Sequence, residues 1–308
     1  MKSHRRRTLA VITAALTGGA LLLAASPAPA APAAPAAPAA FGATAAGKQT
    51  AANKALVSYV YDQLFNKGHV SVLDRYFRTD YIQHNPTLPN GTAAVKELVT
   101  GLRSAYPKAH SHVYRVLAEG NLVLLHSNLL LEPGTKGTAS VDIFRVDHGK
   151  IAEHWDANQS VPDTTASGND MFSTLSPKQP CPNSPGTTAE SEKVATTFFN
   201  ALGQDRDVSA FDRYVAGPYY QHNTQLPNGT AAAKALFALF VQSPYFNVSV
   251  KRVIADGDMV AIHSHYTLAN DRGLAVVDFF RVLKGKVVEH WDVIQAVPET
   301  AANDNTMF

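Results

Sequence analysis

The amino-acid sequence predicts an α+β protein made of two tandem copies of one domain. Each copy is expected to be a curved antiparallel sheet closed by N-terminal helices around a pocket. Three observations support this prediction: a long internal repeat, helical periodicity at the start of each copy, and strand-like segments in the remainder. Helices followed by consecutive strands are typical of an α+β domain with an antiparallel sheet.

The internal repeat covers most of the chain. Its clearest matching pairs are residues 81–85 (YIQHN) with 219–223 (YYQHN), 88–92 (LPNGT) with 226–230 (LPNGT), and 149–156 (GKIAEHWD) with 285–292 (GKVVEHWD). The offset between partners falls only from 138 to 136 residues along the copy. Solenoid repeats have periods of about 20 to 50 residues, so a period this long indicates duplication of a whole domain.

Within the first copy, apolar residues at helical spacing predict a helix over residues 54–66. A short helix is expected after Ser71, running through Phe77, and a third after Thr92; both residues are suitable N-caps. The remaining segments are rich in β-branched, leucine and aromatic residues and are separated by turn residues, which predicts strands. These segments are 112–118, 122–131, 138–146 and 150–159.

The N-terminal segment is expected to be a secretory signal peptide, residues 1–30. Lys2 and three arginines precede an apolar stretch over residues 9–25, and small residues follow around Ala30. A retained membrane anchor is the alternative, but about 17 apolar residues are short for a membrane span. We therefore expect an exported protein with no membrane association after cleavage, by the Sec or the twin-arginine route.

Charge and cysteine content exclude some classes of protein. Cleavage after residue 30 removes four cations and no acid, so the formal charge changes from +2 to −2. A chain of this charge is not expected to bind nucleic acid. The single cysteine, Cys181, excludes an intramolecular disulfide and lies in a Pro-rich stretch typical of a linker. The expected boundaries are 31–50 for an Ala/Pro-rich tether, 51–172 for domain 1, 173–187 for the linker and 188–308 for domain 2.

Several motifs together resemble a known family. They are residues 83–85 (QHN), 90–92 (NGT), 142–145 (DIFR) and 149–156 (GKIAEHWD), with 278–281 (DFFR) and 289–292 (EHWD) in the second copy. This pattern resembles the SnoaL-like branch of the NTF2-like superfamily over both domains. The resemblance implies a conical fold with an interior pocket and no cofactor. The superfamily includes polyketide cyclases, ketosteroid isomerases, dehydratases and non-catalytic proteins, so the resemblance leaves the function open.

The candidate catalytic residues lie on the last strand of each copy. Alternate side chains share one face of a strand, so His154 and Asp156 project together. The carboxylate is suited to abstracting a proton next to a carbonyl, with the imidazole donating to the oxyanion. The resemblance implies the acid/base role for Asp156 and Asp292, with His154 and His290 as their partners. The alternative is a structural His–Asp hydrogen bond.

A second set of residues is expected to bind substrate. It comprises His84, His126, Asp142 and Trp155 in the first copy and His222, His263, Asp278 and Trp291 in the second. Each has a structural alternative: His84 orders a turn, His126 is a hydrogen-bonded core histidine, Asp142 forms a salt bridge, and Trp155 fills the core. The copies also differ, with Asn128 against His265 and Pro86 against Thr224, so their pockets are not expected to be chemically identical.

Two functions follow from these observations. The first is a cofactor-independent acid/base enzyme of the cyclase, isomerase or dehydratase type, acting on a small carbonyl or polyketide-like compound. The second is an exported module that binds a small molecule without catalysis. His154 and Asp156 with His84 or His126 could supply a two-His-one-carboxylate metal site, but such sets arise often by chance, and no metal or other cofactor is expected. The partners expected are a small-molecule ligand and either an intramolecular pseudo-dimer or a homodimer.

Overall fold

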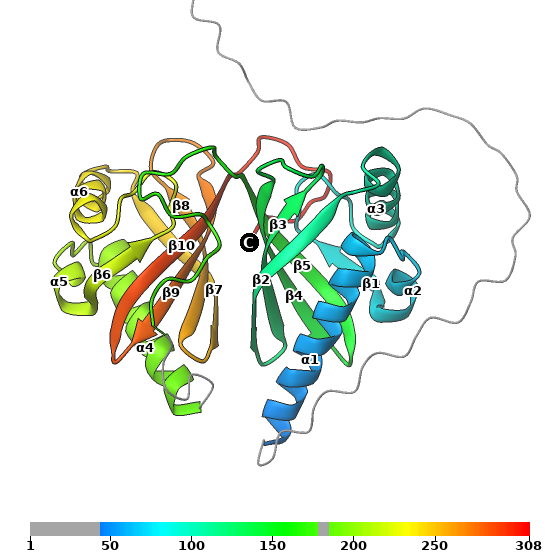
Figure 1. The fold of residues 1–308 in the computed structure, drawn as a ribbon, viewed down its shortest axis with the longest axis horizontal. Helices are drawn as coiled ribbons and strands as arrows, with labels where there is room; N and C mark the ends of the chain where they lie inside the picture. Colours follow the sequence, from blue (N-terminus) through cyan, green and yellow to red (C-terminus); the bar gives the residue numbers. More distant parts are fainter. Residues whose placement is uncertain (1–43, 178–184) are drawn as a thin grey trace, which may run out of the picture. The chain divides into compact units, whose positions relative to one another are not determined.

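The computed structural model describes residues 44–177 and 185–308. The first unit consists of α1 (Ala45–Tyr61), a π-helical turn η1 (Asp62–Asn66), α2 (Val72–Tyr76), β1 (Phe77–Gln83), α3 (Ala93–Ala105), β2 (His110–Glu119), β3 (Leu122–Leu130), β4 (Thr138–Asp147) and β5 (Lys150–Ser160). The second unit consists of α4 (Pro185–Gly203), α5 (Ala210–Tyr214), β6 (Val215–Gln221), α6 (Ala231–Phe240), β7 (Asn247–Asp256), β8 (Met259–Thr267), β9 (Leu274–Leu283) and β10 (Lys286–Ala296). The predicted duplication is therefore present as two units with the same order of α-helices and strands (Figure 1).

Each unit has one five-stranded sheet, and this sheet is mixed, not antiparallel as expected. The strand orders are β1-β5-β4-β3-β2 and β6-β10-β9-β8-β7. Four strands of each sheet pair antiparallel, but β1 pairs parallel with β5, and β6 with β10. The sequence reading missed β1 because its polar and apolar residues do not alternate regularly. Phe77, expected in the preceding helix, has extended backbone angles and begins the strand.

Some element boundaries also differ from the prediction. Helix α1 begins at Ala45, nine residues before the predicted start at residue 54, because the Thr44 hydroxyl accepts a hydrogen bond from the Gly47 N–H at 3.1 Å and caps it. Ser71 and Thr92 occupy N-cap positions but make no capping side-chain hydrogen bond. The predicted signal peptide and residues 31–43 of the tether lie outside the described residues. So does Cys181, within residues 178–184 of the linker.

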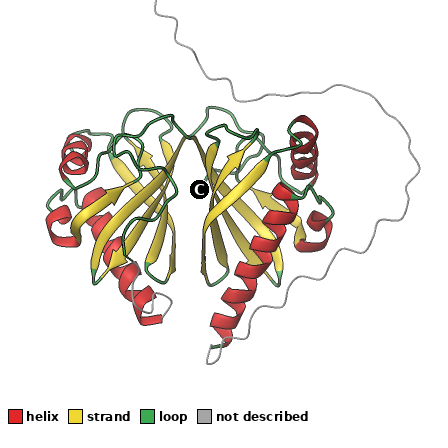
Figure 2. Ribbon diagram, viewed as in Figure 1, coloured by secondary structure: helices red, strands yellow, loops and turns green. Residues whose placement is uncertain are grey.

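The helices of each unit pack on one face of its own sheet (Figure 2). In the first unit this packing buries Val57, Val60, Leu73, Val99, Val123 and Ile151. In the second it buries more aromatic side chains, including Phe198, Phe199, Phe211, Phe246 and Phe280. Burial of such apolar surface stabilises a domain by about 25 cal/mol per Å² removed from water. The helix-covered face is therefore the main source of each unit's own stability.

The opposite faces of the two sheets pack against each other. One buried cluster contains residues of both units, among them Leu124, Trp155, Phe279 and Trp291. Gln295 and Gln159 accept reciprocal hydrogen bonds from the backbone N–H groups of Asn158 (2.8 Å) and Ile294 (2.9 Å). Strands β5 and β10 thus contact each other across an interface inside the chain. Within the described residues, no helix is long and apolar enough to cross a membrane.

Candidate functional site

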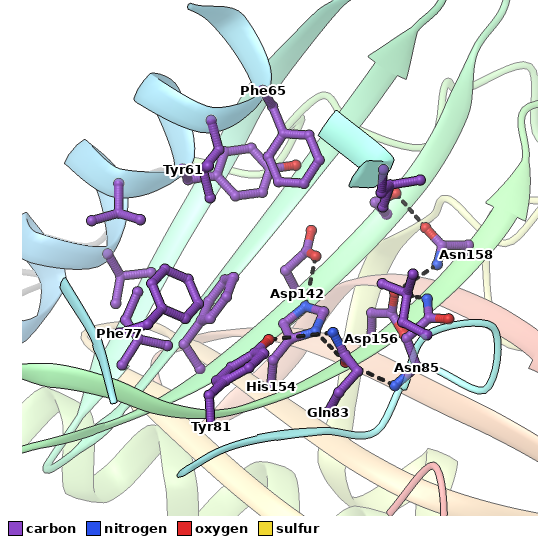
Figure 3. A pocket seen from close by; sticks show the side chains of 18 of the residues that line it. Tyr61, Phe65, Phe77, Tyr81, Gln83, Asn85, Asp142, His154, Asp156 and Asn158 are labelled. Atoms are coloured by element: carbon purple, nitrogen blue, oxygen red, sulfur yellow. Dashed lines mark hydrogen bonds and ion pairs between the residues drawn. The ribbon is translucent and has the colours of Figure 1, made fainter. Parts of the chain in front are cut away.

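The first unit contains a cavity of about 240 Å³ between its helices and the helix-covered face of its sheet. Figure 3 shows its lining side chains converging from α1, η1, β1, β4 and β5. Most of the wall is apolar, formed by Val57, Val60, Leu64, Phe65, Phe77, Leu88, Leu98, Leu129, Phe144 and Ile151. A concave apolar site with a few polar groups is the usual form of a small-molecule site. The polar groups of this cavity are therefore the candidates for chemistry.

Strand alternation brings three ionisable side chains to one side of the cavity. His154 and Asp156 lie two residues apart on β5 and face the cavity together. Asp142 on β4 is the cross-strand partner of Asp156 and joins them on the same face. A ligand-type atom of each residue lies within 4.8 Å of the others. The predicted pair is thus part of a buried Asp–His–Asp cluster.

Both nitrogens of the His154 ring are hydrogen-bonded to acceptors. Nε2 lies 2.9 Å from Asp142 Oδ1, and Nδ1 lies 2.9 Å from Gln83 Oε1. The backbone N–H of Asn85 donates to this same Gln83 oxygen, which identifies it as an acceptor. Because both ring nitrogens must then donate, the geometry favours a charged imidazolium.

The carboxylate of Asp156 is bound on one oxygen only. Its Oδ2 accepts hydrogen bonds from the side-chain amides of Asn85 (2.6 Å) and Asn158 (3.1 Å). Ser140 donates to the amide oxygen of Asn158 and so orients that side chain. Asp156 Oδ1 is buried and has no hydrogen-bond partner among the residues the structure describes. This oxygen belongs to a side chain that lines the cavity and is available to a bound molecule.

The surroundings raise the pKa of both His154 and Asp156. Burial alone would lower the pKa of His154, but the hydrogen bond to Asp142 and the charges of Asp156 and Asp142 outweigh it and raise the pKa. Burial raises the pKa of Asp156; His154 and the two asparagine amides oppose this rise only in part. A carboxyl group whose pKa is raised toward neutrality is suited to both accepting and releasing a proton.

A metal ion fits this cluster poorly. A histidine must lose a ring proton to ligate a metal, whereas the contacts of His154 raise its pKa and hold both protons. The third ligands considered from the sequence, His84 and His126, do not line the cavity. The arrangement is better described as a hydrogen-bonded charge cluster.

The second unit repeats the cluster with different surroundings. His290 bonds Asp278 (3.1 Å) and Gln221 (2.7 Å), and Asn223 donates to Asp292 at 2.6 Å. Ile294 stands where the first unit has Asn158, so Asp292 lacks the second amide. Burial, reinforced by the charge of Asp278 and opposed by His290, raises the pKa of Asp292 to about 6.

The other residues expected to bind substrate lie in the interface between the units. His84 stacks on Trp155 at 4.7 Å between ring centroids, and His222 stacks on Trp291 at 4.8 Å. His126 stacks on Phe279 of the second unit at 5.0 Å. The corresponding His263 contacts the Arg252 guanidinium, which lies over the Trp155 ring. Of these residues, His84, His126 and Trp155 lie outside the lining of the first unit's cavity. Contact of His84, His126, Trp155, His222, His263 and Trp291 with substrate stays a prediction.

Sequence reasoning overlooked the residues that hold the cluster. Gln83 and Asn85 flank His84, and alternation turns them to the cavity side while His84 faces the interface. Asn158 follows Asp156 by two residues on β5, so alternation alone was sufficient to place it in the cavity. Gln83 was not predictable in this way, since its position opposite His154 depends on the unpredicted parallel strand β1.

Comparison with known proteins identifies one domain family that matches both units. A family model described as a SnoaL-like domain matches residues 57–154 and again residues 195–290, together more than half of the chain. No curated protein matches the sequence.

Solved structures to which the chain is similar include three bacterial proteins of low sequence identity. A protein from Kribbella flavida titled as a putative ketosteroid isomerase is 23% identical over 36% of this chain and 82% of its own, with a TM-score of 0.32. A protein from Bacillus cereus titled as a putative polyketide cyclase is 20% identical over 36% and 78%, with a TM-score of 0.33. An NTF2-like protein of unknown function from Mesorhizobium loti is 21% identical over 40% and 100%, with a TM-score of 0.33. By the match of the family model to both units, the chain belongs to the SnoaL-like domain family and carries two of its domains in tandem.

Proposed function

We propose that the first unit catalyses cofactor-independent proton transfer on a small, largely apolar carbonyl compound, as in isomerase, dehydratase or aldol-cyclase chemistry. The observation that carries this proposal is Asp156 Oδ1, a buried and unpartnered carboxylate oxygen on a side chain that lines an apolar cavity. Burial of a carboxylate oxygen without a hydrogen-bond partner costs free energy. The presence of such an oxygen at the cavity therefore favours a role in contact with a bound molecule.

In the proposed step, Asp156 removes a proton from the carbon next to the substrate carbonyl. The electrons of the broken C–H bond form an enolate. Asp156 then returns the proton to the same or a conjugated carbon of the enolate, or to the alkoxide or departing hydroxide that an aldol or dehydration step creates. The His154 imidazolium lies within 4.8 Å of the Asp156 carboxyl and offsets the negative charge that develops. Asp142 and Gln83 hold both ring N–H groups, so His154 acts through its charge and not as the direct donor expected from the sequence.

Hydrogen–deuterium exchange tests this function without knowledge of the natural substrate. The full chain is incubated in D₂O with a panel of cyclic and aromatic ketones, and loss of α-protons is followed by NMR. We expect accelerated exchange, reduced about 10³-fold in Asp156→Asn, in line with the usual contribution of a general base. Asp292→Asn is the matched variant of the second unit, where Asp292 Oδ1 is also buried without a hydrogen-bond partner among the described residues; it should lower the rate less than Asp156→Asn, because Asp156 lines the cavity. Equal rates in wild type and Asp156→Asn would contradict the proposal.

Non-catalytic binding is the second candidate function. It is favoured by one observation: both N–H groups of His154 are bound within the protein, so no ring proton is free for an oxyanion. Under this alternative, members of the panel perturb the cavity resonances with ordinary saturation, yet their α-protons exchange at the uncatalysed rate. The same experiment therefore separates the two functions.

We also propose that the protein is exported, as the basic, apolar and small-residue order of residues 1–30 suggests. N-terminal sequencing of the protein recovered outside the producing cell is expected to begin near residue 31. A cell-associated protein that retains its first 30 residues would contradict this expectation.

A further inference from the structure

The segment that follows each sheet binds the opposite unit. We call residues 161–177, after β5, the first tail and residues 297–308, after β10, the second tail. Hydrogen bonds from the second tail converge on one segment of the first unit, residues 83–90. This segment connects β1 to α3 and carries Gln83 and Asn85, the partners of the charge cluster.

Two asparagines of the second tail hold the backbone of that segment. Asn305 donates to the carbonyl of Gln83 and to the side chain of Asn90, both at 2.8 Å. Asn303 donates to the carbonyls of Asn85 (2.8 Å) and Leu88 (2.7 Å). The bonds thus act on the main chain of the same two residues whose side chains bind His154 and Asp156.

Further contacts join the second tail to the same segment. The backbone N–H of Ala302 donates to the Pro86 carbonyl at 2.7 Å, and His84 Nδ1 lies 2.5 Å from the Thr306 carbonyl. The second ring nitrogen of His84 binds Glu153 on β5 at 2.9 Å. His84 therefore connects the tail of one unit to the cluster-bearing strand of the other, while its neighbours face the cavity.

The first tail makes the reciprocal contacts on the second unit. Asn169 donates to the carbonyl of Gln221 (3.0 Å) and to the side chain of Asn228 (2.9 Å). His222 bonds the Asp170 carbonyl, and Ala166 donates to Thr224. Each tail thus contacts the segment that carries the glutamine and asparagine of the opposite unit's charge cluster. The tail contacts and the cluster occur together in both units, although the surrounding cavity residues differ.

We infer that the second tail, through Asn303 and Asn305, is a positioning element of the first unit's cavity site, and that Asn169 has the same role for the second unit. Each site would then be complete only when the opposite unit's tail is bound. This inference deepens the proposed function, because it takes Asp156 and His154 as the working groups. A loop carrying site residues gains precision from such supporting hydrogen bonds.

Because each tail binds the opposite unit, a variant of one tail leaves the contacts of the other tail intact as a control. Full-length Asn303→Ala/Asn305→Ala and Asn169→Ala variants are compared with wild type by NMR titration of the His154 and His290 imidazoles and the Asp156 and Asp292 carboxyls. In the double variant, weaker contacts from Asn85 and Gln83 should raise the Asp156 titration midpoint and lower that of His154, each by about one pH unit. The His290 and Asp292 midpoints should stay unchanged. Asn169→Ala should instead raise the Asp292 midpoint and lower that of His290, and leave the midpoints of Asp156 and His154 unchanged.

A purely structural role would give another result. If both variants lower the unfolding temperature but move no midpoint, or move the midpoints of both units equally, the inference is wrong. The single Asn305→Ser variant, which keeps a donor of shorter reach, serves if the double variant does not fold. It should give a smaller shift in the same direction and in the first unit only.

The titrations do not depend on catalysis, so the inference and the proposed function can fail separately. Absence of exchange in wild type, with the expected shift of midpoints, would reject the enzyme but keep the positioning role. If wild type does catalyse exchange, the double variant should lower kcat about tenfold or more with little change in KM. An unchanged kcat would overturn the inference while leaving the function intact.

Discussion

The two cavity sites share their charged groups and differ in what surrounds them. Asp142, His154 and Asp156 have exact counterparts, and both histidines are bound in the same way. Around them, three polar residues of the first unit become apolar in the second, and one leucine becomes a tyrosine. The replacements, first unit to second, are Tyr61 to Phe199, Leu129 to Tyr266, Ser140 to Val276 and Asn158 to Ile294.

These differences change the environment of the carboxyl more than its position. The first unit gives Asp156 two amide donors and leaves Leu129 at the cavity wall. In the second unit Asp292 keeps one amide, and the hydroxyl of Tyr266 reaches Asp278 at 3.3 Å. Duplicated sites can therefore keep their reacting groups while their hydrogen-bonding shells and steric limits diverge. The following predictions test this comparison from the largest expected effect to the smallest.

The largest difference is expected for a pair of equivalent glutamates outside the cavities. Glu289 is fully buried and accepts bonds from Leu175, Ser176 and His222, whereas Glu153 is partly exposed and binds His84 and Arg145. Glu289→Ala should lower the free energy of unfolding by about 3–5 kcal/mol, because it leaves buried donors unpaired. Glu153→Ala should cost about 1 kcal/mol. Urea unfolding measures both, and equal losses would contradict the comparison.

The second prediction concerns pH-dependent stability. Because the pKa of Asp292 is about 6 in the folded protein and about 3.9 when unfolded, the folded state binds more protons between these values. The free energy of unfolding contributed by this group therefore falls as pH rises from about 4 to 6, by up to about 3 kcal/mol.

Urea unfolding across pH 4 to 7 tests this sign. Asp292→Asn should remove that fall, so the variant gains stability relative to wild type as pH increases. Asp156→Asn is the matched variant in the first unit, where a second amide supports the charged carboxylate. If Asp292→Asn leaves the pH profile unchanged, the buried environment assigned to Asp292 is incorrect.

The third prediction exchanges a residue of the cavity wall. Leu129→Tyr introduces into the first unit the bulk that Tyr266 has in the second, and should weaken ligand binding about 10- to 100-fold through overpacking. Tyr266→Leu is the reverse change and should leave affinity for the first cavity as in wild type. Titration of the best ketone of the panel measures both; equal affinity in Leu129→Tyr would indicate that the ligand does not occupy this cavity.

The smallest effect is expected from exchange of the amide donor. Asn158→Ile removes one donor to Asp156 and should raise its pKa by about one unit; Ile294→Asn should lower that of Asp292 by a similar amount. NMR titration of the two carboxyls gives the values. Shifts of the same sign in both variants would show that the amide is not what distinguishes the two sites.

Prediction of side-chain faces from the sequence succeeded where only strand alternation was needed. It placed His154 and Asp156 on one face and Glu153 and Trp155 on the other, as the structure has them. The sequence predicted that His84 lines the pocket, whereas its neighbours Gln83 and Asn85 line the cavity. Alternation within a segment determines which side chains share a face, but not which face meets the cavity.

By itself, the sequence determined the duplication, three helices and the last four strands of the first unit, and the pairs of residues that share a strand face. These properties depend on local periodicity and on recurrence along the chain. Only the tertiary structure decided that β1 joins each sheet in parallel, that one sheet face forms a cavity and the other an interface, and that each tail binds the opposite unit. Those outcomes depend on contacts between residues as far apart as Gln83 and Asn305, and no local pattern encodes such contacts.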